Sequence, residues 1–276
     1  VLTTTRIHLH YLMLLIVPVG LSSDYSFNVF PVITTIANGY VLGALALGSA
    51  AVAAGWAVRR THPVVTFALI GYPVFFAVTS NVLVTIGVTA ERHLYAPSIA
   101  WCLLVAYGAW RLYMSFGRLV AVAFAALLVA FGELTLARNR TWHDELVLFR
   151  AQAASAPASV RARFNYGTLL VKMGENERAV PELEAAAAIY PGHPDIFYNL
   201  GNALRVTHAD PERVIRAYRE AIRLDPGNKP AISNLAVFLT GLGRRREARP
   251  LVLELARQDP AYHSLRLLHR LLGMAP

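Results

Sequence analysis

The sequence predicts an all-α protein in two parts: a membrane domain of four or five helices, then an α-solenoid of three helical hairpins with capping helices. Two observations predict it. The first 137 residues hold only three carboxylates and six arginines, placed between long uncharged stretches. After them, four prolines recur at intervals of 34, 35 and 34 residues: Pro157, Pro191, Pro226 and Pro260. We therefore expect a membrane domain over residues 1–140 and a repeat domain over residues 141–276.

Four uncharged stretches define the predicted membrane helices: residues 28–58, 61–90, 94–110 and 119–132. A span needs about 20 largely apolar residues, so the first two suffice and the third is short. The fourth suffices if Glu133 lies near the water interface and the helix continues to Ala137. A fifth, marginal candidate contains Pro18 and is either the end of a span or a re-entrant segment: residues 7–21. Lipid leaves no partner for open backbone groups, so the clear spans must be helices.

The arginines of the membrane domain divide between its two predicted sides. One side carries five if the marginal segment crosses the membrane: Arg6, Arg59, Arg60, Arg111 and Arg118. The other side carries three: Arg92, Arg138 and Arg140. The larger group favours the cytoplasm. This places the repeat domain on the non-cytoplasmic side of a multi-pass protein, which we expect in a bacterial inner membrane. Cys102, the single cysteine, is expected to be a small buried residue within a span.

The prolines close units that align position by position. The first helices contain Phe164-Asn165-Tyr166-Gly167, Tyr198-Asn199-Leu200-Gly201 and Ser233-Asn234-Leu235-Ala236. The second helices carry small or branched residues where helices pack closely: Ala179, Ala186, Val214, Ala221, Ala248 and Leu255. A period of 34 residues is typical of tetratricopeptide (TPR) hairpins, which stack into a solenoid with a concave binding face. The units are predicted at about 160–193, 194–228 and 229–262, with capping helices at 144–156 and 261–272.

The repeats predict a peptide-binding groove. Asn165, Asn199 and Asn234 occupy one position in three successive first helices, so stacking should line them along the inner surface. A carboxamide offers both a donor and an acceptor, which matches a peptide backbone. Neighbouring groove positions give a basic, partly aromatic lining suited to acidic or extended segments: Arg161, Lys172, Tyr198, Asn202 and Arg205. The alternative is that asparagine is common at this repeat position and faces water.

Three segments outside the repeats carry a resemblance to a known family: residues 11–26 (YLMLLIVPVGLSSDYS), 90–103 (AERHLYAPSIAWCL) and 138–149 (RNRTWHDELVLF). With the repeats in the same order, the chain resembles the C-terminal half of the transmembrane and tetratricopeptide-repeat protein O-mannosyltransferases and their bacterial relatives. The resemblance implies a GT-C glycosyltransferase that uses a lipid-phosphate-linked sugar outside the cytoplasm. The family's catalytic carboxylate lies in the first external loop, so the resemblance implies that this loop is absent and that Val1 begins midway through a longer protein.

The turn between the second and third predicted spans is the candidate donor site. Arg92 suits the phosphate of a polyprenyl-phosphate sugar, since a guanidinium binds phosphate through paired hydrogen bonds. Glu91 would orient Arg92, and His93 and Tyr95 belong to the same turn, where Tyr95 could hydrogen-bond a phosphate or sugar oxygen. The alternative is that these charges pair with one another and anchor helix ends. Asp24 is a weak catalytic candidate, because base catalysis also needs a positioned partner and helix capping is the commoner role.

Two functions therefore remain open. In one, the chain is the donor-facing and acceptor-binding part of an enzyme that transfers a sugar, expected to be mannose, to Ser or Thr of exported proteins. In the other, it is a non-catalytic, membrane-anchored scaffold for protein assembly, so the question of enzymatic activity stays open. The expected partners are a peptide or protein in the groove and membrane lipids. No cofactor is evident, no basic tract suggests nucleic acid, and Trp142-His143-Asp144-Glu145 lacks the paired ligands of a metal site.

Overall fold

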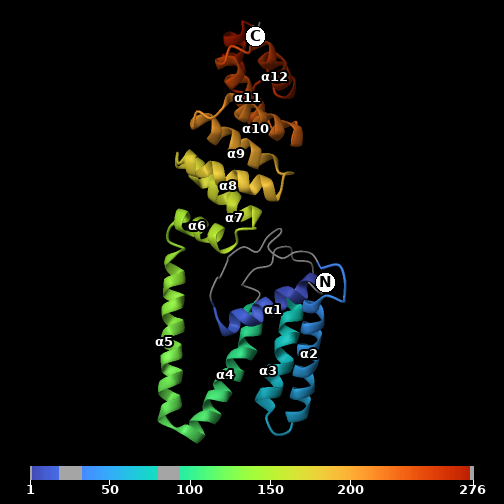
Figure 1. The fold of residues 1–276 in the computed structure, drawn as a ribbon, viewed down its shortest axis with the longest axis vertical. Helices are drawn as coiled ribbons and strands as arrows, with labels where there is room; N and C mark the ends of the chain where they lie inside the picture. Colours follow the sequence, from blue (N-terminus) through green and yellow to red (C-terminus); the bar gives the residue numbers. More distant parts are fainter. Residues whose placement is uncertain (1, 19–32, 80–93, 274–276) are drawn as a thin grey trace. The chain divides into compact units, whose positions relative to one another are not determined.

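The structure is a computed structural model that describes residues 2–18, 33–79 and 94–273. Thirteen helices and no strand lie within these ranges, which confirms the predicted all-α class. The chain separates into two compact units, residues 1–159 and residues 160–276 (Figure 1). The division falls after the first predicted capping helix, whereas the sequence placed it near residue 140. The domain boundary at residue 140 stays a prediction.

The described residues of the first unit form six helices: α1 (Leu2–Ile16), α2 (Gly39–Val58), α3 (Pro63–Thr79), α4 (Tyr95–Phe116), α5 (Arg118–Arg140) and α6 (Glu145–Ser155). Helices α2, α4 and α5 are long and apolar enough to cross a membrane. The described part of α3 is apolar but shorter, because the predicted span continues into residues 80–90, which lie outside the described ranges. Helix α4 is longer than predicted, since Arg111 ends the uncharged stretch without ending the helix.

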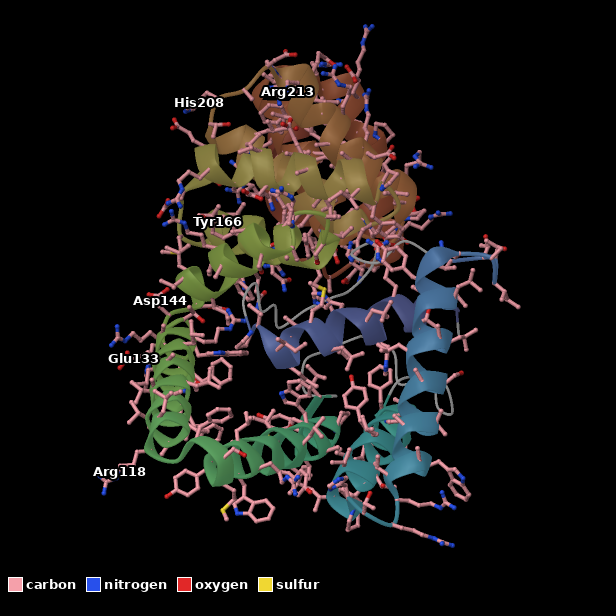
Figure 2. All side chains as sticks on the ribbon, turned by 60° about the horizontal axis from the view of Figure 1, so that its bottom comes forward. Arg118, Glu133, Asp144, Tyr166, His208 and Arg213 are labelled. Carbon is pink, nitrogen blue, oxygen red and sulfur yellow. The ribbon has the colours of Figure 1, made fainter. Side chains whose placement is uncertain are left out.

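The connections of the first unit place the arginines. The α2–α3 turn, which carries Arg59 and Arg60, and the α4–α5 turn at Gly117 lie at the same end of the helices (Figure 1). Helix α1 runs across the other helices and not alongside them, as a re-entrant or interfacial segment would (Figures 1 and 2). Arg6 lies 5.0 Å from the centroid of the Tyr40 ring, near the start of α2 and so at the opposite end. Arg6 therefore does not lie at the end of the helices that carries Arg59 and Arg60, and the sidedness of the protein stays a prediction.

The helices of the first unit contact one another through apolar and polar side chains. Tyr11, Leu14 and Phe76 form a small buried cluster between α1 and α3. The Thr66 hydroxyl donates to the carbonyl of Gly55 at 2.9 Å and joins α3 to α2. Cys102 is exposed on α4, which corrects the expectation of a buried residue. The reason is that α4 packs on α3 through its other face, so Cys102 borders the hollow between α4 and α5.

The second unit contains three hairpins and a last helix: α7 (Val160–Lys172), α8 (Asn176–Ile189), α9 (Pro194–Val206), α10 (Pro211–Leu224), α11 (Lys229–Gly241), α12 (Arg245–Gln258) and α13 (Leu265–Leu272). These bounds match the three predicted repeats, and α13 begins later than residue 261. The four recurring prolines each follow the residue that caps the end of a helix: Ala156, Tyr190, Asp225 and Asp259. Proline there prevents the helix from continuing.

The repeats pack through the positions that the alignment selected. Ala179, Ala186, Val214, Ala221, Ala248 and Leu255 are all fully buried. The closest approach uses glycine in two repeats: a Cβ added at Gly167 would lie 2.8 Å from the Leu183 side chain, and one at Gly201 would lie 2.8 Å from the Tyr218 ring. The third repeat has Ala236 at the same position, also fully buried. Small side chains thus let the two helices of each hairpin meet.

The turns within the three hairpins share one backbone conformation. Gly174, His208 and Gly243 have φ angles of 81°, 52° and 75°, in the left-handed region. After each, the next amide donates to a carbonyl five residues back, as from Ala209 to Leu204 at 3.1 Å. This hydrogen bond closes a helix end in the Schellman manner and normally requires glycine. His208, labelled in Figure 2, therefore takes a glycine position in the repeat that has one extra residue.

Helix α6 follows the last apolar helix and begins with a cap of its own. The Asp144 carboxylate accepts a hydrogen bond from the Val147 amide at 3.0 Å. The segment Trp142-His143-Asp144-Glu145 therefore contains the N-terminal cap of α6. Glu133 and Arg118 lie exposed along α5, as Figure 2 shows. No group of three or more potential metal ligands occurs within residues 2–18, 33–79 and 94–273.

Candidate functional site

The second repeat presents a polar stripe on its first helix. On α9, Ile196, Leu200 and Ala203 are buried against neighbouring helices. Tyr198, Asn202 and Arg205 follow at helical spacings of four and three residues, so they share one face. Tyr198 and Asn202 are half-buried and Arg205 is exposed. The sequence predicted all three as groove residues, and the structure brings them together on this face.

A hydrogen-bond network joins this stripe to the next helix and the next repeat. Asn202 Oδ1 accepts two hydrogen bonds, one from the Tyr218 hydroxyl at 2.8 Å and one from Asn234 Nδ2 at 2.9 Å. Tyr218 belongs to α10 and Asn234 to α11, so the Asn202 amide ties three helices together. Tyr218 was not among the predicted groove residues. The Tyr218 hydroxyl reaches Asn202 because α10 folds back onto α9. The spacing of residues in the sequence does not show this contact.

The hydroxyl of Tyr218 is the buried end of the network. The residue is fully buried, and burial raises the pKa of its hydroxyl. The Arg205 guanidinium nearby opposes this rise in the pKa, both through a hydrogen bond and through its charge. The Tyr198 ring lies 6.5 Å from the Tyr218 ring, measured between centroids. The hydroxyl therefore stays protonated at neutral pH and is available as a donor.

Further polar groups continue the surface into the third repeat. The Lys229 ammonium lies 2.9 Å from the Asp259 carboxylate, which lowers the pKa of that carboxyl. Burial raises the pKa of the Tyr262 hydroxyl, and the nearby Tyr198 raises it further. The basic, partly aromatic lining of the groove stays a prediction.

The predicted row of equivalent asparagines has a mixed arrangement. Asn234 takes part in the network, whereas Asn199 donates its Nδ2 to the carbonyl of Asp195 in its own helix at 2.9 Å. Asn165 is half-buried on α7. No hydrogen bond joins Asn165, Asn199 and Asn234 to one another in the described part of the chain. Peptide contact by this row stays a prediction.

Arg161 and Lys172, the remaining predicted groove residues, lie near the two ends of α7. Both are exposed, Arg161 in the first turn and Lys172 at the last residue. Neither takes a direct hydrogen bond from, or gives one to, the Asn202 network. Their contribution to binding also stays a prediction.

The candidate donor and catalytic residues fall mostly outside the described residues. Asp24, Glu91, Arg92 and His93 lie in segments 19–32 and 80–93, for which no placement is given. Tyr95 is described: it is the first residue of α4, its side chain is 79% exposed, and its carbonyl accepts from the Ser98 hydroxyl at 2.8 Å. The exposed phenol is free to meet a ligand or the lipid interface, and the donor site stays a prediction.

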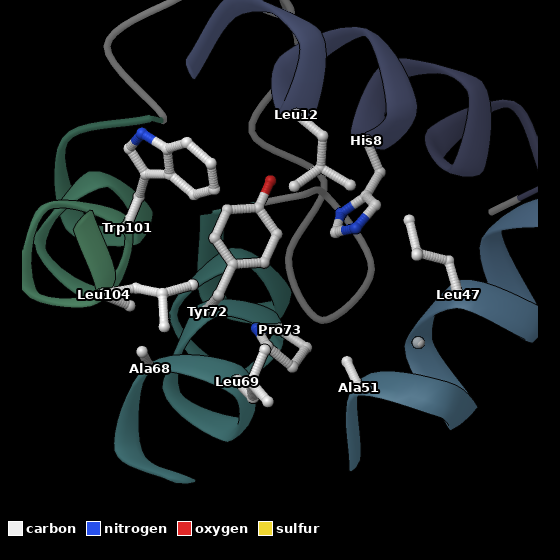
Figure 3. Close-up of a pocket in the computed structure, with 12 residues that line it drawn as sticks. His8, Leu12, Leu47, Ala51, Ala68, Leu69, Tyr72, Pro73, Trp101 and Leu104 are labelled. Carbon is white, nitrogen blue, oxygen red and sulfur yellow. The ribbon is translucent and has the colours of Figure 1, made fainter. Parts of the chain in front are cut away.

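A cavity of about 240 Å³ lies within the first unit between α1, α2, α3 and α4 (Figure 3). Its walls are apolar except for His8 and Tyr72, and the Tyr72 hydroxyl points into it, as the close-up shows. This hydroxyl is buried and has no hydrogen-bond partner among the residues of known placement. Neither residue was predicted from the sequence. The signal in the sequence that could have indicated them is the presence of a histidine and a tyrosine within otherwise apolar stretches.

A second hollow, of about 570 Å³, lies between α4 and α5. Most of its lining is apolar, with Arg138 and Asn139 at the end where α5 leaves the predicted membrane. Both hollows are open to the surroundings of an apolar helix group, where lipid chains are the expected solvent.

Comparisons with known proteins support both units. Models of the tetratricopeptide repeat match residues 148–194 and 164–229, and a second such model matches residues 205–268. The Homo sapiens protein O-mannosyl-transferase TMTC1 is 30% identical over 205 residues, covering 70% of this chain and 23% of that protein. The Drosophila melanogaster protein O-mannosyl-transferase Tmtc2 is 38% identical over 128 residues, covering 45% of this chain and 13% of that protein. The chain thus spans less than a quarter of the length of these relatives.

Two solved structures match parts of the chain. The MamA protein matches with a TM-score of 0.43 and 19% identity, covering 50% of this chain and 78% of that chain. YrrB, described as a TPR protein with an unusual peptide-binding site, matches with a TM-score of 0.40 and 18% identity, covering 59% of this chain and 82% of that chain. At these scores the assignment of the repeats rests on the sequence models and on the helices described above.

Proposed function

We propose that this TMTC-like tetratricopeptide-repeat protein serves glycosyl transfer at a membrane, with one task for each unit. The apolar helices of the first unit handle a polyprenyl-phosphate-linked sugar. The repeats bind the exported protein whose Ser or Thr hydroxyl receives that sugar. The sugar is expected to be mannose, because the similar curated proteins are named O-mannosyl-transferases.

One observation carries the proposal. The similarity to the human protein covers 70% of this chain, which is more than either unit contains, so it includes membrane helices and repeats together. A repeat protein with an unrelated membrane anchor would match over its repeats alone. The polar, half-buried stripe on α9 supports the acceptor-binding half of the proposal.

The donor half depends on chemistry at the edge of the membrane. A polyprenyl-phosphate sugar keeps its chain in lipid and its charged phosphate at the interface, where a guanidinium would bind it. Arg92 is the proposed phosphate ligand, with Glu91 and Tyr95 beside it in sequence. Acceptor and donor must meet on one side of the membrane, so we place the repeats on the non-cytoplasmic side.

The experiment measures donor and acceptor binding separately in membranes that contain the full chain. A photoreactive polyprenyl-phosphate mannose should label the chain, and Arg92→Ala should reduce labelling while peptide capture by the repeats is unchanged. Arg60→Ala, at the α2–α3 turn, is the matched control and should label as the wild type does. Peptide capture without donor labelling would replace the proposal by a membrane-anchored scaffold. Absence of both activities would contradict the proposal as a whole.

A further inference from the structure

The cavity between α1, α2, α3 and α4 has two polar side chains in an otherwise apolar wall (Figure 3). Of the described residues that line it, none is Asp, Glu, Lys or Arg. The rings of His8 and Tyr72 lie edge to face with their centroids 5.3 Å apart, so the two polar side chains occupy the same part of the wall. A ligand that fits this cavity is therefore uncharged, mostly apolar and polar at one point.

The Tyr72 hydroxyl points into the cavity and has no hydrogen-bond partner within the ranges that the structure describes. Leaving a buried hydroxyl unpaired costs about 1–3 kcal/mol. A ligand atom that accepts a hydrogen bond from Tyr72 removes this cost, whereas a saturated lipid chain does not. The unpaired hydroxyl thus favours a ligand that carries a hydrogen-bonding group.

The wall also contains groups that accept hydrogen bonds. Pro73 lies inside α3 and lines the cavity. Because proline has no amide hydrogen, the carbonyl of Leu69, another lining residue, lacks the donor that a regular helix provides four residues ahead. The neutral His8 imidazole has one nitrogen that donates and one that accepts. A hydroxyl group matches this wall because it both donates and accepts, whereas an ester carbonyl only accepts.

The volume of the cavity, about 240 Å³, limits the size of its occupant. An apolar cavity of roughly 150 Å³ binds one benzene molecule, and pockets for drug-sized ligands begin near about 300 Å³. The cavity therefore suits the polar end and the first carbons of a longer molecule. Leu47 lines it and is also exposed on α2, so the remainder of a chain can continue into the surrounding lipid.

We propose that this cavity binds a lipid alcohol, an uncharged molecule with one hydroxyl on a long apolar chain, and that Tyr72 recognises the hydroxyl. The inference is independent of the proposed function, because the proposed phosphate ligand Arg92 does not line the cavity. A phosphate does not suit the site, since none of its described lining residues carries a positive charge at the side chain except a protonated His8.

The test uses the full chain in phosphatidylcholine nanodiscs with two photoreactive probes of equal chain length, a long-chain alcohol and the corresponding alkane. The alcohol should label the helices around the cavity at a lower concentration than the alkane does. Tyr72→Phe should weaken labelling by the alcohol about threefold to tenfold, the size expected when one hydrogen bond is lost, and leave labelling by the alkane unchanged. Gly48→Leu should reduce labelling by both probes, because Gly48 lines the cavity and a Cβ added there meets nothing within 4 Å.

A matched control and a stability measurement separate recognition from packing. Tyr107 does not line the cavity, and its hydroxyl lies 2.7 Å from the His62 imidazole, so Tyr107→Phe should be labelled as the wild type is. Without the alcohol, Tyr72→Phe should melt at or above the temperature of the wild type, because it removes an unpaired hydroxyl. Adding the alcohol should raise the melting temperature of the wild type more than that of Tyr72→Phe.

Four results would contradict the inference. Absence of labelling by the alcohol would overturn the site itself. Equal labelling by alcohol and alkane would assign the cavity to lipid chains in general and overturn recognition of a hydroxyl. Equal labelling of the wild type and Tyr72→Phe by the alcohol would overturn the role of Tyr72. A Tyr72→Phe chain that is less stable without the alcohol would show that the hydroxyl already has a partner in the protein. Labelling by polyprenyl-phosphate mannose tests the proposed function separately and is expected in every case.

Discussion

Helices α5 and α11 are both rich in Ala, Leu and Val, yet they use these residues in opposite ways. No residue of α5 is buried, and most of its apolar side chains are exposed. Helix α11 buries six residues against its neighbours: Ala231, Ile232, Ser233, Leu235, Ala236 and Leu239. Apolar side chains can remain on the surface of a helix that faces lipid, whereas a helix that faces water must bury them. Lipid covers α5, whereas the repeats must cover α11 themselves.

The largest expected effect tests this difference with one substitution in each region. Leu239 is fully buried, so Leu239→Ala should lower the free energy of unfolding of the repeat unit by about 2–5 kcal/mol. Leu128 on α5 is 56% exposed, so Leu128→Ala removes much less packing and should cost much less than Leu239→Ala. Thermal unfolding of the full chain in one detergent, followed by circular dichroism, measures both. Equal losses would contradict the contrast between the two regions.

Glycines sharpen the comparison with a smaller effect. A Cβ at Gly201 would lie 2.8 Å from the buried Tyr218 ring, so Gly201→Ala should cost about 1–3 kcal/mol through overpacking. Nothing lies within 4 Å of a Cβ at Gly132 on α5, so Gly132→Ala should be neutral or stabilise the helix. The same melting experiment compares the two variants. A Gly201→Ala chain as stable as the wild type would show that the hairpin is not closely packed there.

The helix boundaries of the first unit could be predicted where arginines lie in the turns between helices. The α2–α3 turn follows from Arg59 and Arg60, but Arg111 led to an early end for α4 because a charged residue was taken as a boundary. Arginine near a helix end can extend to the interface, so its charge does not stop the helix. The exposure of Cys102 was missed because an apolar stretch looks the same in sequence whether its residues face lipid or are buried in protein.

The repeat unit was predictable in its helices and less so in its site. The prolines and the aligned positions fix α7 to α12, because each unit repeats the same packing. The link between Asn202 and Asn234 was missed because the two residues hold different positions in successive repeats. Tyr218 was missed because its hydroxyl reaches α9 only after the hairpin has closed. Residues at equivalent positions identify the repeat, whereas this hydrogen-bond network joins residues at different positions of successive repeats.

His208 offers a prediction on the turns of the repeats. It adopts a φ of 52° where the other two hairpins have glycine, and this conformation costs a residue with a Cβ about 1–2 kcal/mol. His208→Gly should relieve this cost and, after the greater flexibility of an unfolded glycine is subtracted, stabilise the repeat unit by up to about 1 kcal/mol. Chemical denaturation of the full chain in detergent measures the change. A destabilised His208→Gly chain would show that the imidazole makes a contact that outweighs the strain.

The smallest effect concerns the ion pairs between repeats. Hydrogen bonds from Arg244 and from Arg219 lower the pKa of the Glu247 carboxyl below its ordinary value. A carboxyl with a lowered pKa in the folded state stabilises the protein above its ordinary pKa, and this stability is lost as the pH falls through the lowered value. The pairs are exposed, so the effect is small.

We therefore expect the melting temperature of the repeat unit to fall between pH 5 and pH 3, and to fall less in Glu247→Gln, which has no proton to gain. The range follows from the ordinary Glu pKa of about 4.3 and its downward shift. Melting curves at matched ionic strength provide the measurement. A Glu247→Gln chain that loses stability as steeply as the wild type would assign the pH dependence to other carboxyls.

Cysteine labelling tests most directly the central claim that the helices of the first unit face lipid while the repeats face water on the non-cytoplasmic side. Cys102 is the only cysteine of the chain and is exposed on α4. In intact membranes it should resist a membrane-impermeant maleimide. In a Cys102→Ser background, Arg246→Cys on the repeats should react from the non-cytoplasmic side, and Arg60→Cys at the α2–α3 turn only from the cytoplasmic side. Ready labelling of Cys102, or labelling of the other two positions from the same side, would contradict the account.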